Sequence, residues 1–347
     1  MALGAQAPWG GPAGPSPMDR SKLLFVALAF GALALWPLAA GNYGIDLVTK
    51  IMIYAVFALS LELLVGGTGL VCFGQAAFFG VGAYATVLLS PADAAASVLW
   101  LLPACILLAA LYALAVGALS VRTRGVYFIM VTLAFAQMAY YVVHDTPLGG
   151  GTDGIYLNAR PVIGGWLDLG KPLPLYGFTL ACLAGVFVGL ALLLRSRLGR
   201  ALAGIRVNEQ RMRATGFSTY PYKLAAFTVS GGIAGLAGFL FAVKDGLVNP
   251  ELMSWHLSGA VLIMIILGGL GHLRGALVGA FAFALLQELF KSEAIFGTFA
   301  KHWLLGLGLT IIASVALLPR GLVGVPAQLR ERLLGRRGTL RGTRGGA

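Results

Sequence analysis

Long apolar stretches separated by short polar segments occupy the chain from residue 20 onward. A membrane-crossing helix needs about 20 mostly apolar residues to span about 30 Å of hydrocarbon. The pattern predicts ten spans, at residues 23–45, 47–65, 70–90, 97–120, 125–143, 175–194, 224–243, 252–271, 275–290 and 302–319. We divide 252–290 in two because it is too long for one crossing and Arg274 lies near its middle. The pattern therefore predicts an all-α polytopic membrane protein with about ten transmembrane helices.

Both ends of the chain differ from this apolar body. Residues 1–19 are rich in Gly, Pro and Ala without hydrophobic periodicity, a composition typical of a disordered tail. Residues 323–347 carry six arginines and one acid, so we expect a basic tail. One transmembrane domain is predicted over residues 20–322.

The composition agrees with a lipid environment. Hydrophobic residues make up 59% of the chain and charged residues 11%, whereas soluble domains are about half apolar and a quarter charged. The three cysteines form no CxxC pair and the four histidines are scattered, so neither a disulfide framework nor a metal site is predicted. These features exclude an ordinary soluble enzyme and a secreted disulfide scaffold.

The basic residues fix the predicted orientation, because cytoplasmic loops carry an excess of Lys and Arg. With ten spans and the N-terminus inside, 19 of the 25 basic residues lie on the inner side and 6 on the outer side. Both termini are then cytoplasmic. The net charge of +12 is explained by topology, so nucleic-acid binding is not predicted.

Two loops between the spans are long enough to carry a function. The outer loop, 144–174, contains the glycine-rich run 149–154. The inner loop, 195–221, is strongly basic and has one acid, Glu209. Within it, 199–215 is punctuated like a short helix that ends at Gly216. Such a helix would bind anionic lipid or a partner protein.

Two apparent nucleotide-binding motifs lack the required context. Residues 165–171 have the spacing of a P-loop, but Pro172 stands where a Ser or Thr is needed. Residues 149–154 match a dinucleotide fingerprint by letter, yet they follow a predicted membrane helix instead of a strand. No catalytic residues, metal site or bound cofactor are therefore predicted, and any ATP would be bound by another subunit.

Two acidic residues fall within the predicted spans, Glu62 near an inner end and Glu288 near an outer end. Ionisable groups inside a membrane are usually functional. Both positions would allow the side chain to reach the interface by snorkelling. A gradient-driven carrier would more often place a charge near the midplane, so the sequence disfavours ion coupling.

Glycines interrupt the hydrophobic pattern near the second and third spans. The run from Gly66 to Gly69 breaks a helix, and small residues surround Gln75, Phe78 and Gly82. Two interpretations remain open. One is a tightly packed helix with a buried amide, and the other is a broken helix that presents Gln75 to a translocation path. Residues 268–279 form a second small-residue seam, for which packing is the favoured interpretation.

Four separated segments, at residues 66–84, 149–155, 196–227 and 265–280, resemble the LivM-type permease family of branched-chain amino-acid ABC importers. The resemblance covers roughly residues 45–325 and implies a fold like that of type II ABC importer permeases. It also implies that the inner loop docks in a cleft of an ATPase subunit. The loop positions that carry over are Gly199, Arg200, Ile205, Arg206, Asn208, Glu209 and Gly216. The outer positions Gly150, Gly151, Thr152, Asp153 and Gly154 would face a substrate-binding protein.

The resemblance implies a non-hydrolytic permease subunit in a bacterial or archaeal inner membrane. Its implied partners are a second homologous permease, two ATPase subunits, an extracytoplasmic binding protein, a small-molecule substrate and the lipid bilayer. Branched-chain amino acids are the expected substrate, with urea, amides and aromatic acids as alternatives within the family. A self-sufficient ion-coupled transporter or channel is the alternative of another class.

Overall fold

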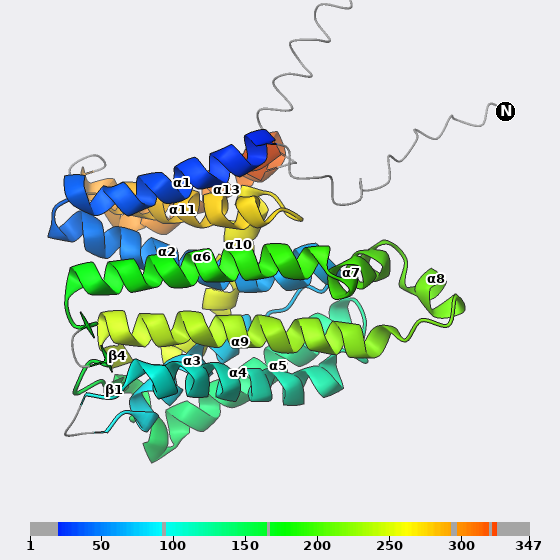
Figure 1. Cartoon of the computed structure of the whole chain (residues 1–347), viewed down its shortest axis with the longest axis horizontal. Coiled ribbons are helices and arrows are strands. Elements are labelled where there is room, and N and C mark those ends of the chain that lie inside the picture. Colours follow the sequence, from blue (N-terminus) through cyan, green and yellow to red (C-terminus); the bar gives the residue numbers. More distant parts are fainter. Residues whose placement is uncertain (1–19, 92–94, 165–166, 293–296, 319–320, 325–347) are drawn as a thin grey trace, which may run out of the picture.

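The computed structural model describes residues 20–91, 95–164, 167–292, 297–318 and 321–324. The tail predicted over 1–19 and nearly all of the basic tail lie outside these ranges. The helices that make up the body of the molecule lie side by side (Figure 1). Their arrangement places the 195–221 loop at one end of the body and the glycine-rich loop at the other.

Two long helices form the centre of the bundle. They are α2 (Asn42–Thr68) and α9 (Thr219–Asp245), whose most apolar windows are 89% and 83% buried. Helices α3 (Gln75–Leu89) and α4 (Val98–Ser120) pack against α9. Aromatic rings fill the space between them, as where Phe57 contacts Phe79 and Phe78 contacts Phe227. The core therefore lies between four helices that consist largely of apolar residues.

The surrounding helices bury much less of their apolar surface. They are α1 (Arg20–Ala39), α5 (Val126–Asp145), α6 (Pro172–Arg195), α10 (Trp255–Gly268), α11 (Leu273–Lys291) and α13 (Trp303–Leu317). Leucines on their outer faces, such as Leu192, Leu285 and Leu309, are exposed. In water such a surface would be unfavourable, but hydrocarbon accepts it.

Among the described residues, seven helices are long and apolar enough to cross a membrane. Three further apolar helices, α1 in part, α3 and α10, are shorter. Together they account for the ten predicted apolar segments and confirm a helical membrane protein. How many of these ten segments cross the whole membrane remains a prediction.

Three predicted boundaries were wrong because local backbone geometry ends helices that hydropathy alone would continue. The first helix stops at Ala39 and Gly41 is extended, so Ile45 belongs to α2 and not to the predicted span 23–45. Helix α2 ends at Gly69, which has a φ of +76°, and α3 begins only at Gln75 instead of at residue 70. Helix α10 begins at Trp255, after a short 3₁₀ helix, η3 (Pro250–Met253).

Small residues permit several close helix contacts. A Cβ at Gly82 would overlap the carbonyl oxygen of Gly235, and one at Gly238 would overlap that of Phe79. The pair α10 and α11 is joined in the same way, since a Cβ at Gly268 would overlap the Gly275 carbonyl. The predicted packing seam over 268–279 is therefore confirmed as a backbone contact between two helices.

Short non-helical elements gather at the end opposite α7 and α8 (Figure 1). Strand β1 (Ile155–Tyr156) pairs antiparallel with β4 (Leu247–Val248), and β2 (Val162–Ile163) pairs with β3 (Leu167–Asp168). The 3₁₀ helices η1 (Pro147–Gly149) and η2 (Gly151–Asp153) precede them, and η4 (Gly297–His302) precedes α13. All four strands have two residues, so the membrane body remains helical.

Candidate functional site

The inner loop folds as two short helices, α7 (Arg197–Val207) and α8 (Glu209–Ala214). Ser196 begins α7 by accepting a hydrogen bond from the Gly199 amide. A Cβ at Gly199 would overlap the backbone of Leu194, so glycine permits the sharp turn from α6. Helix α7 is amphipathic, because Ala201, Leu202 and Ile205 are buried while its arginines are exposed. Its apolar face thereby attaches the loop to the membrane body.

The single helix predicted over 199–215 is wrong in one respect, because Asn208 interrupts it. Asn208 is extended, and its side-chain oxygen accepts a hydrogen bond of 2.9 Å from the Arg211 amide to cap α8. Asparagine favours such caps over helix interiors because its side chain competes for backbone donors. The predicted end at Gly216 is confirmed, with a φ of +79° after the last turn of α8.

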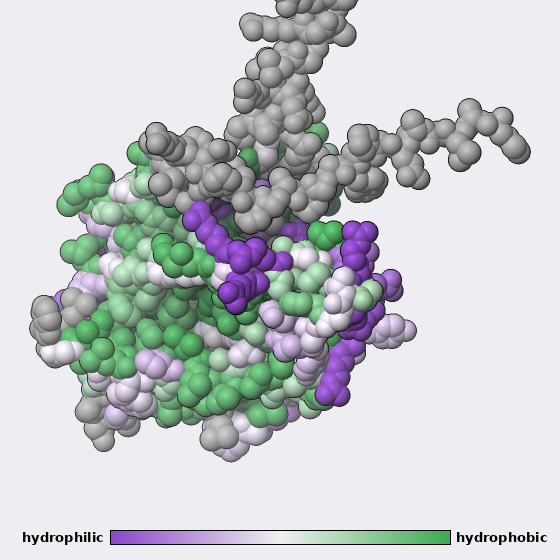
Figure 2. All heavy atoms as spheres, turned by 45° about the vertical axis from the view of Figure 1, so that its right-hand side comes forward, coloured by the Kyte–Doolittle hydropathy of each residue, from purple (hydrophilic) through white to green (hydrophobic). Residues whose placement is uncertain are grey.

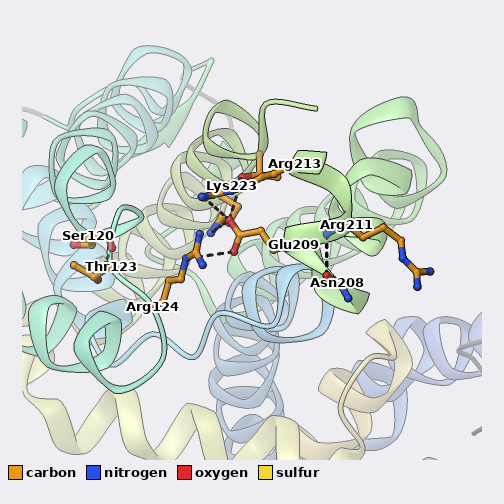
Figure 3. A network of polar contacts seen from close by, with 9 residues as sticks. Ser120, Thr123, Arg124, Asn208, Glu209, Arg211, Arg213 and Lys223 are labelled. Atoms are coloured by element: carbon orange, nitrogen blue, oxygen red, sulfur yellow. Dashed lines mark hydrogen bonds and ion pairs between the residues drawn. The ribbon is translucent and has the colours of Figure 1, made fainter. Parts of the chain in front are cut away.

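Glu209 is the centre of an ionic network that holds the loop (Figure 3). Its Oε1 lies 3.0 Å from Lys223 Nζ and 2.7 Å from Arg213 Nη2, and it accepts a 3.0 Å hydrogen bond from the Thr219 hydroxyl. Arg124, in the turn between α4 and α5, approaches Oε2 at 4.0 Å. The carboxylate thus joins α8, the start of α9 and the α4–α5 turn.

The two main partners in this network, Lys223 and Glu209, are largely buried. The Lys223 side chain is 3% exposed and that of Glu209 is 19% exposed. Burial raises the pKa of Glu209, but the hydrogen bond and charge of Lys223, with Thr219 and Arg213, outweigh it and hold that pKa below its usual value. Glu209 is therefore ionised at neutral pH, and it faces its own chain instead of solvent.

The exposed surface around α7 and α8 is basic. Arg195, Arg197, Arg200 and Arg211 are exposed beside the exposed apolar side chain of Val207. Hydrophilic residues gather toward the end of the molecule that carries α7 and α8, while hydrophobic residues cover much of the rest (Figure 2). A surface of this kind fits an acidic cleft better than it fits hydrocarbon.

The opposite end of the molecule presents the glycine-rich loop. Gly150, Gly151 and Gly154 all have positive φ, and a Cβ at Gly150 or Gly154 would overlap nearby backbone atoms. Glycine is therefore required for this tight path. Thr152 and Asp153 are exposed at its tip. Pairing of β1 with β4 then fixes the loop to the end of α9.

Comparison with known proteins agrees with this architecture. The family model "Branched-chain amino acid transport system / permease component" matches residues 43–315. The high-affinity branched-chain amino acid transport system permease protein LivM of Escherichia coli K12 is 30% identical, over 88% of this chain and 75% of that protein. The probable branched-chain amino acid transport permease protein LivH of Methanocaldococcus jannaschii is 28% identical over 43% of this chain and 48% of its own length.

A sugar permease matches over a shorter region. The xylose transport system permease protein XylH of Escherichia coli K12 is 30% identical over 34% of this chain and 30% of that protein. No solved structure matches the chain significantly. The family model, by contrast, covers well over half of the residues. The chain belongs to the branched-chain amino acid permease family.

Membership defines the broad role of the protein. It is a multi-pass membrane permease component of an ABC importer and a non-catalytic transport subunit. Among the described residues, no group of three or more His, Cys, Asp and Glu side chains is arranged to hold a metal ion.

Of the residues that the sequence associated with a helix break or a path, Gln75, Phe78 and Gly82 are buried, Gly66 is half-buried and Gly69 is exposed. Gln75 is fully buried, and its Nε2 donates to Ser60 Oγ at 2.8 Å and Ser230 Oγ at 2.9 Å. Phe78 packs between Tyr112 and Phe227. Gly69 ends α2, so the predicted helix break is present. These contacts match the interpretation of a packed helix with a buried amide, and a role in translocation remains a prediction.

A cavity of about 750 Å³ lies elsewhere in the permease. It is lined by residues of α2, α9, α10, α11 and α13 and of the segment 247–254, with apolar walls that include Ile263, Met264 and Phe283. Lys50, Glu251 and Glu288 are among its polar residues. None of Gly66, Gly69, Gln75, Phe78 and Gly82 contributes to its lining. The sequence analysis missed this region because its residues come from five helices that are spread along the chain.

Glu62 also differs from its prediction. Its side chain is 2% exposed, and Oε1 accepts a 2.6 Å hydrogen bond from the Gly271 amide. It therefore does not snorkel to the interface. Glu288, in contrast, is partly exposed and accepts a hydrogen bond from the Tyr43 hydroxyl at the start of α2. The sequence marked both acids, but nothing in it indicated that Gly271 is the partner of Glu62.

Proposed function

We propose that this permease forms, with a second homologous permease, the translocation path for branched-chain amino acids, and that two separate ATPase subunits drive it. Ten apolar helices with both termini cytoplasmic, in a type II importer arrangement, would place α7 and α8 on the ATPase side. The observation that supports this proposal most strongly is the exposed basic surface of α7 and α8. The Glu209 network attaches this surface to two other parts of the chain, the start of α9 and the α4–α5 turn.

Branched-chain amino acids are favoured over other substrates by the extent of the similarity. The relation to LivM covers 88% of this chain, whereas that to the xylose permease covers 34%. A binding protein outside the membrane would deliver the substrate to the glycine-rich loop, where Thr152 and Asp153 are exposed. Urea, amides and aromatic acids are the alternatives within the family.

Uptake by the reconstituted complex tests the proposal. The chain, its partner permease, two ATPase subunits and the binding protein are placed in proteoliposomes, and uptake of labelled leucine and xylose is measured. We expect leucine uptake that requires ATP and is absent when the ATPases are omitted. Xylose uptake without leucine uptake would contradict the substrate. Gradient-driven uptake by the chain alone would contradict the role as a subunit.

A further inference from the structure

A buried carboxylate lies where α2 meets the turn between α10 and α11. Glu62 is six residues from the end of α2, and its Oε1 holds the Gly271 amide at 2.6 Å. Among the residues that the structure describes, its Oε2 has no hydrogen-bond partner. Burying a carboxylate is unfavourable unless its interactions compensate. Leucine would fill this helix position without that penalty, so packing alone does not explain Glu62.

A residue of the inner loop reaches the same point. Arg206, in the last turn of α7, donates from Nη1 to the carbonyl oxygen of Gly66. A Cβ built on Gly271 would lie 3.2 Å from the same nitrogen, so the guanidinium lies directly beside the α10–α11 turn. Its positive charge also acts on the Glu62 carboxylate. Arg206 therefore contacts its own chain, although it belongs to the loop that we assign to ATPase docking.

Glycines permit this junction. A Cβ at Gly66 would overlap Glu62 Oε1 and would lie 3.2 Å from the Gly271 Cα atom. Gly271 has a φ of +86°, which side chains rarely adopt. A Cβ at Gly66 would displace the Glu62 side chain, and a larger residue at Gly271 would strain the backbone and crowd Arg206. Helix α2 and the turn therefore meet at backbone distance, and α7 reaches them through the Arg206 side chain.

Close packing of α10 against α11 connects the α10–α11 turn to the wall of the cavity. Helices α10 and α11 contact each other through backbone at Gly268, Gly275 and Gly279. Two helices packed this closely move together, because an interface packed to this density shifts between discrete arrangements and does not deform continuously. Beyond that contact, the same two helices provide Ile263, Met264 and Phe283 to the cavity wall.

We propose that Glu62, Arg206 and Gly271 form an internal link that transmits displacement of α7 to the α10–α11 pair and so reshapes the cavity. Glu62 is a positioning residue in this link, because it holds the turn through the Gly271 amide. The inference rests on the proposed function, since it requires that an ATPase moves α7. The inference adds the path by which displacement of α7 would reach the helices of the membrane body.

The test uses the full importer in proteoliposomes with two substitutions at one position. Glu62→Gln keeps an oxygen that accepts from Gly271, whereas Glu62→Leu has a similar size and no acceptor. We expect Glu62→Leu to lower leucine uptake per ATP hydrolysed about tenfold, the effect of losing one hydrogen bond to a charged group. Glu62→Gln should remain within about twofold of the unmodified importer, because the acceptor is retained.

A fluorescent label on the turn separates transmission from local stability. His272 is exposed, so His272→Cys is labelled in a background with Cys182→Ala, since Cys182 is the least buried of the three cysteines. ATP should change the fluorescence emission of the label in the importer with native Glu62 and in the Glu62→Gln variant. It should not change the emission in a Glu62→Leu variant that still hydrolyses ATP. If Glu62→Leu keeps both the ATP-dependent emission change and the uptake per ATP hydrolysed, the proposed link is overturned.

Arg206→Leu provides an independent test if Glu62→Leu does not assemble, because the Arg206 side chain lies at the surface. Because Arg206 also belongs to the docking loop, the emission change is expressed per ATPase subunit that co-purifies with the variant importer, and on that basis it should be lost. Retention of that change would contradict the inference. A lack of ATP-driven uptake in the unmodified importer would instead contradict the proposed function, so the two failures are distinguishable.

Discussion

At the residue scale, some of the inner-loop side chains that the sequence singled out face solvent, and others contact the rest of the chain. The sequence marked Arg200 and Glu209 as equivalent members of a docking motif. The structure separates them, because Arg200 is exposed while Glu209 contacts Lys223, Arg213 and Thr219. One short segment therefore attaches to the membrane body through Glu209 and leaves Arg200 exposed for the proposed docking.

Removal of the Glu209 carboxylate should destabilise the loop. In Glu209→Ala, the ammonium of Lys223 remains buried without its acid, and we expect a loss of about 1–3 kcal/mol. Thermal denaturation in detergent measures this change. Lys223→Met is the matched control, because Glu209 keeps Arg213 and Thr219 and no buried amine is left unpaired. An equal or larger loss in Lys223→Met would contradict this account of the network.

The same carboxylate should make loop stability depend on pH. The folded pKa of Glu209 lies below its ordinary value, so its contribution is complete above about pH 4.3 and is lost as the pH falls through the folded pKa. Limited proteolysis at the arginines of the loop should detect opening only under those acidic conditions. Glu209→Gln should abolish the acid-dependent step, and opening between pH 5 and 7 in the unmodified chain would contradict this assignment.

At the element scale, hydropathy located every apolar helix, but backbone geometry set where each one begins and ends. Residues 70–74 are as apolar as the helix that follows, so their non-helical path before Gln75 left no signal in composition. The break at Asn208 was readable in principle from its capping preference. The Glu62–Gly271 contact was not, because it joins residues 209 positions apart.

Close contact between α3 and α9 gives an element-scale prediction. Gly82→Ala places a Cβ against the backbone of Gly235, which has no flexible side chain to move aside. We expect a loss of about 1–3 kcal/mol from overpacking, seen as a lower midpoint of thermal denaturation. Gly185→Ala in α6 is the control, since an added Cβ there meets nothing within 4 Å. Equal midpoints for the two variants would contradict the proposed packing.

At the scale of the whole molecule, the two surfaces for which we propose functions lie at opposite ends of one helical body (Figure 1). The glycine-rich loop is tied to the end of α9 through β1 and β4, and the inner loop is tied to the start of α9 through Lys223. One buried helix therefore connects the two ends. Sequence predicted both surfaces and their sides from charge, while the shared helix became evident only from the structure.

Site-specific photo-crosslinking in the assembled importer tests the central claim most directly. A photoreactive residue replaces Arg211, which is exposed in α8, and in a matched variant it replaces Thr152 in the glycine-rich loop. Our account predicts an adduct between position 211 and an ATPase subunit, and none between position 152 and that subunit. An ATPase adduct at position 152, with none at 211, would contradict it.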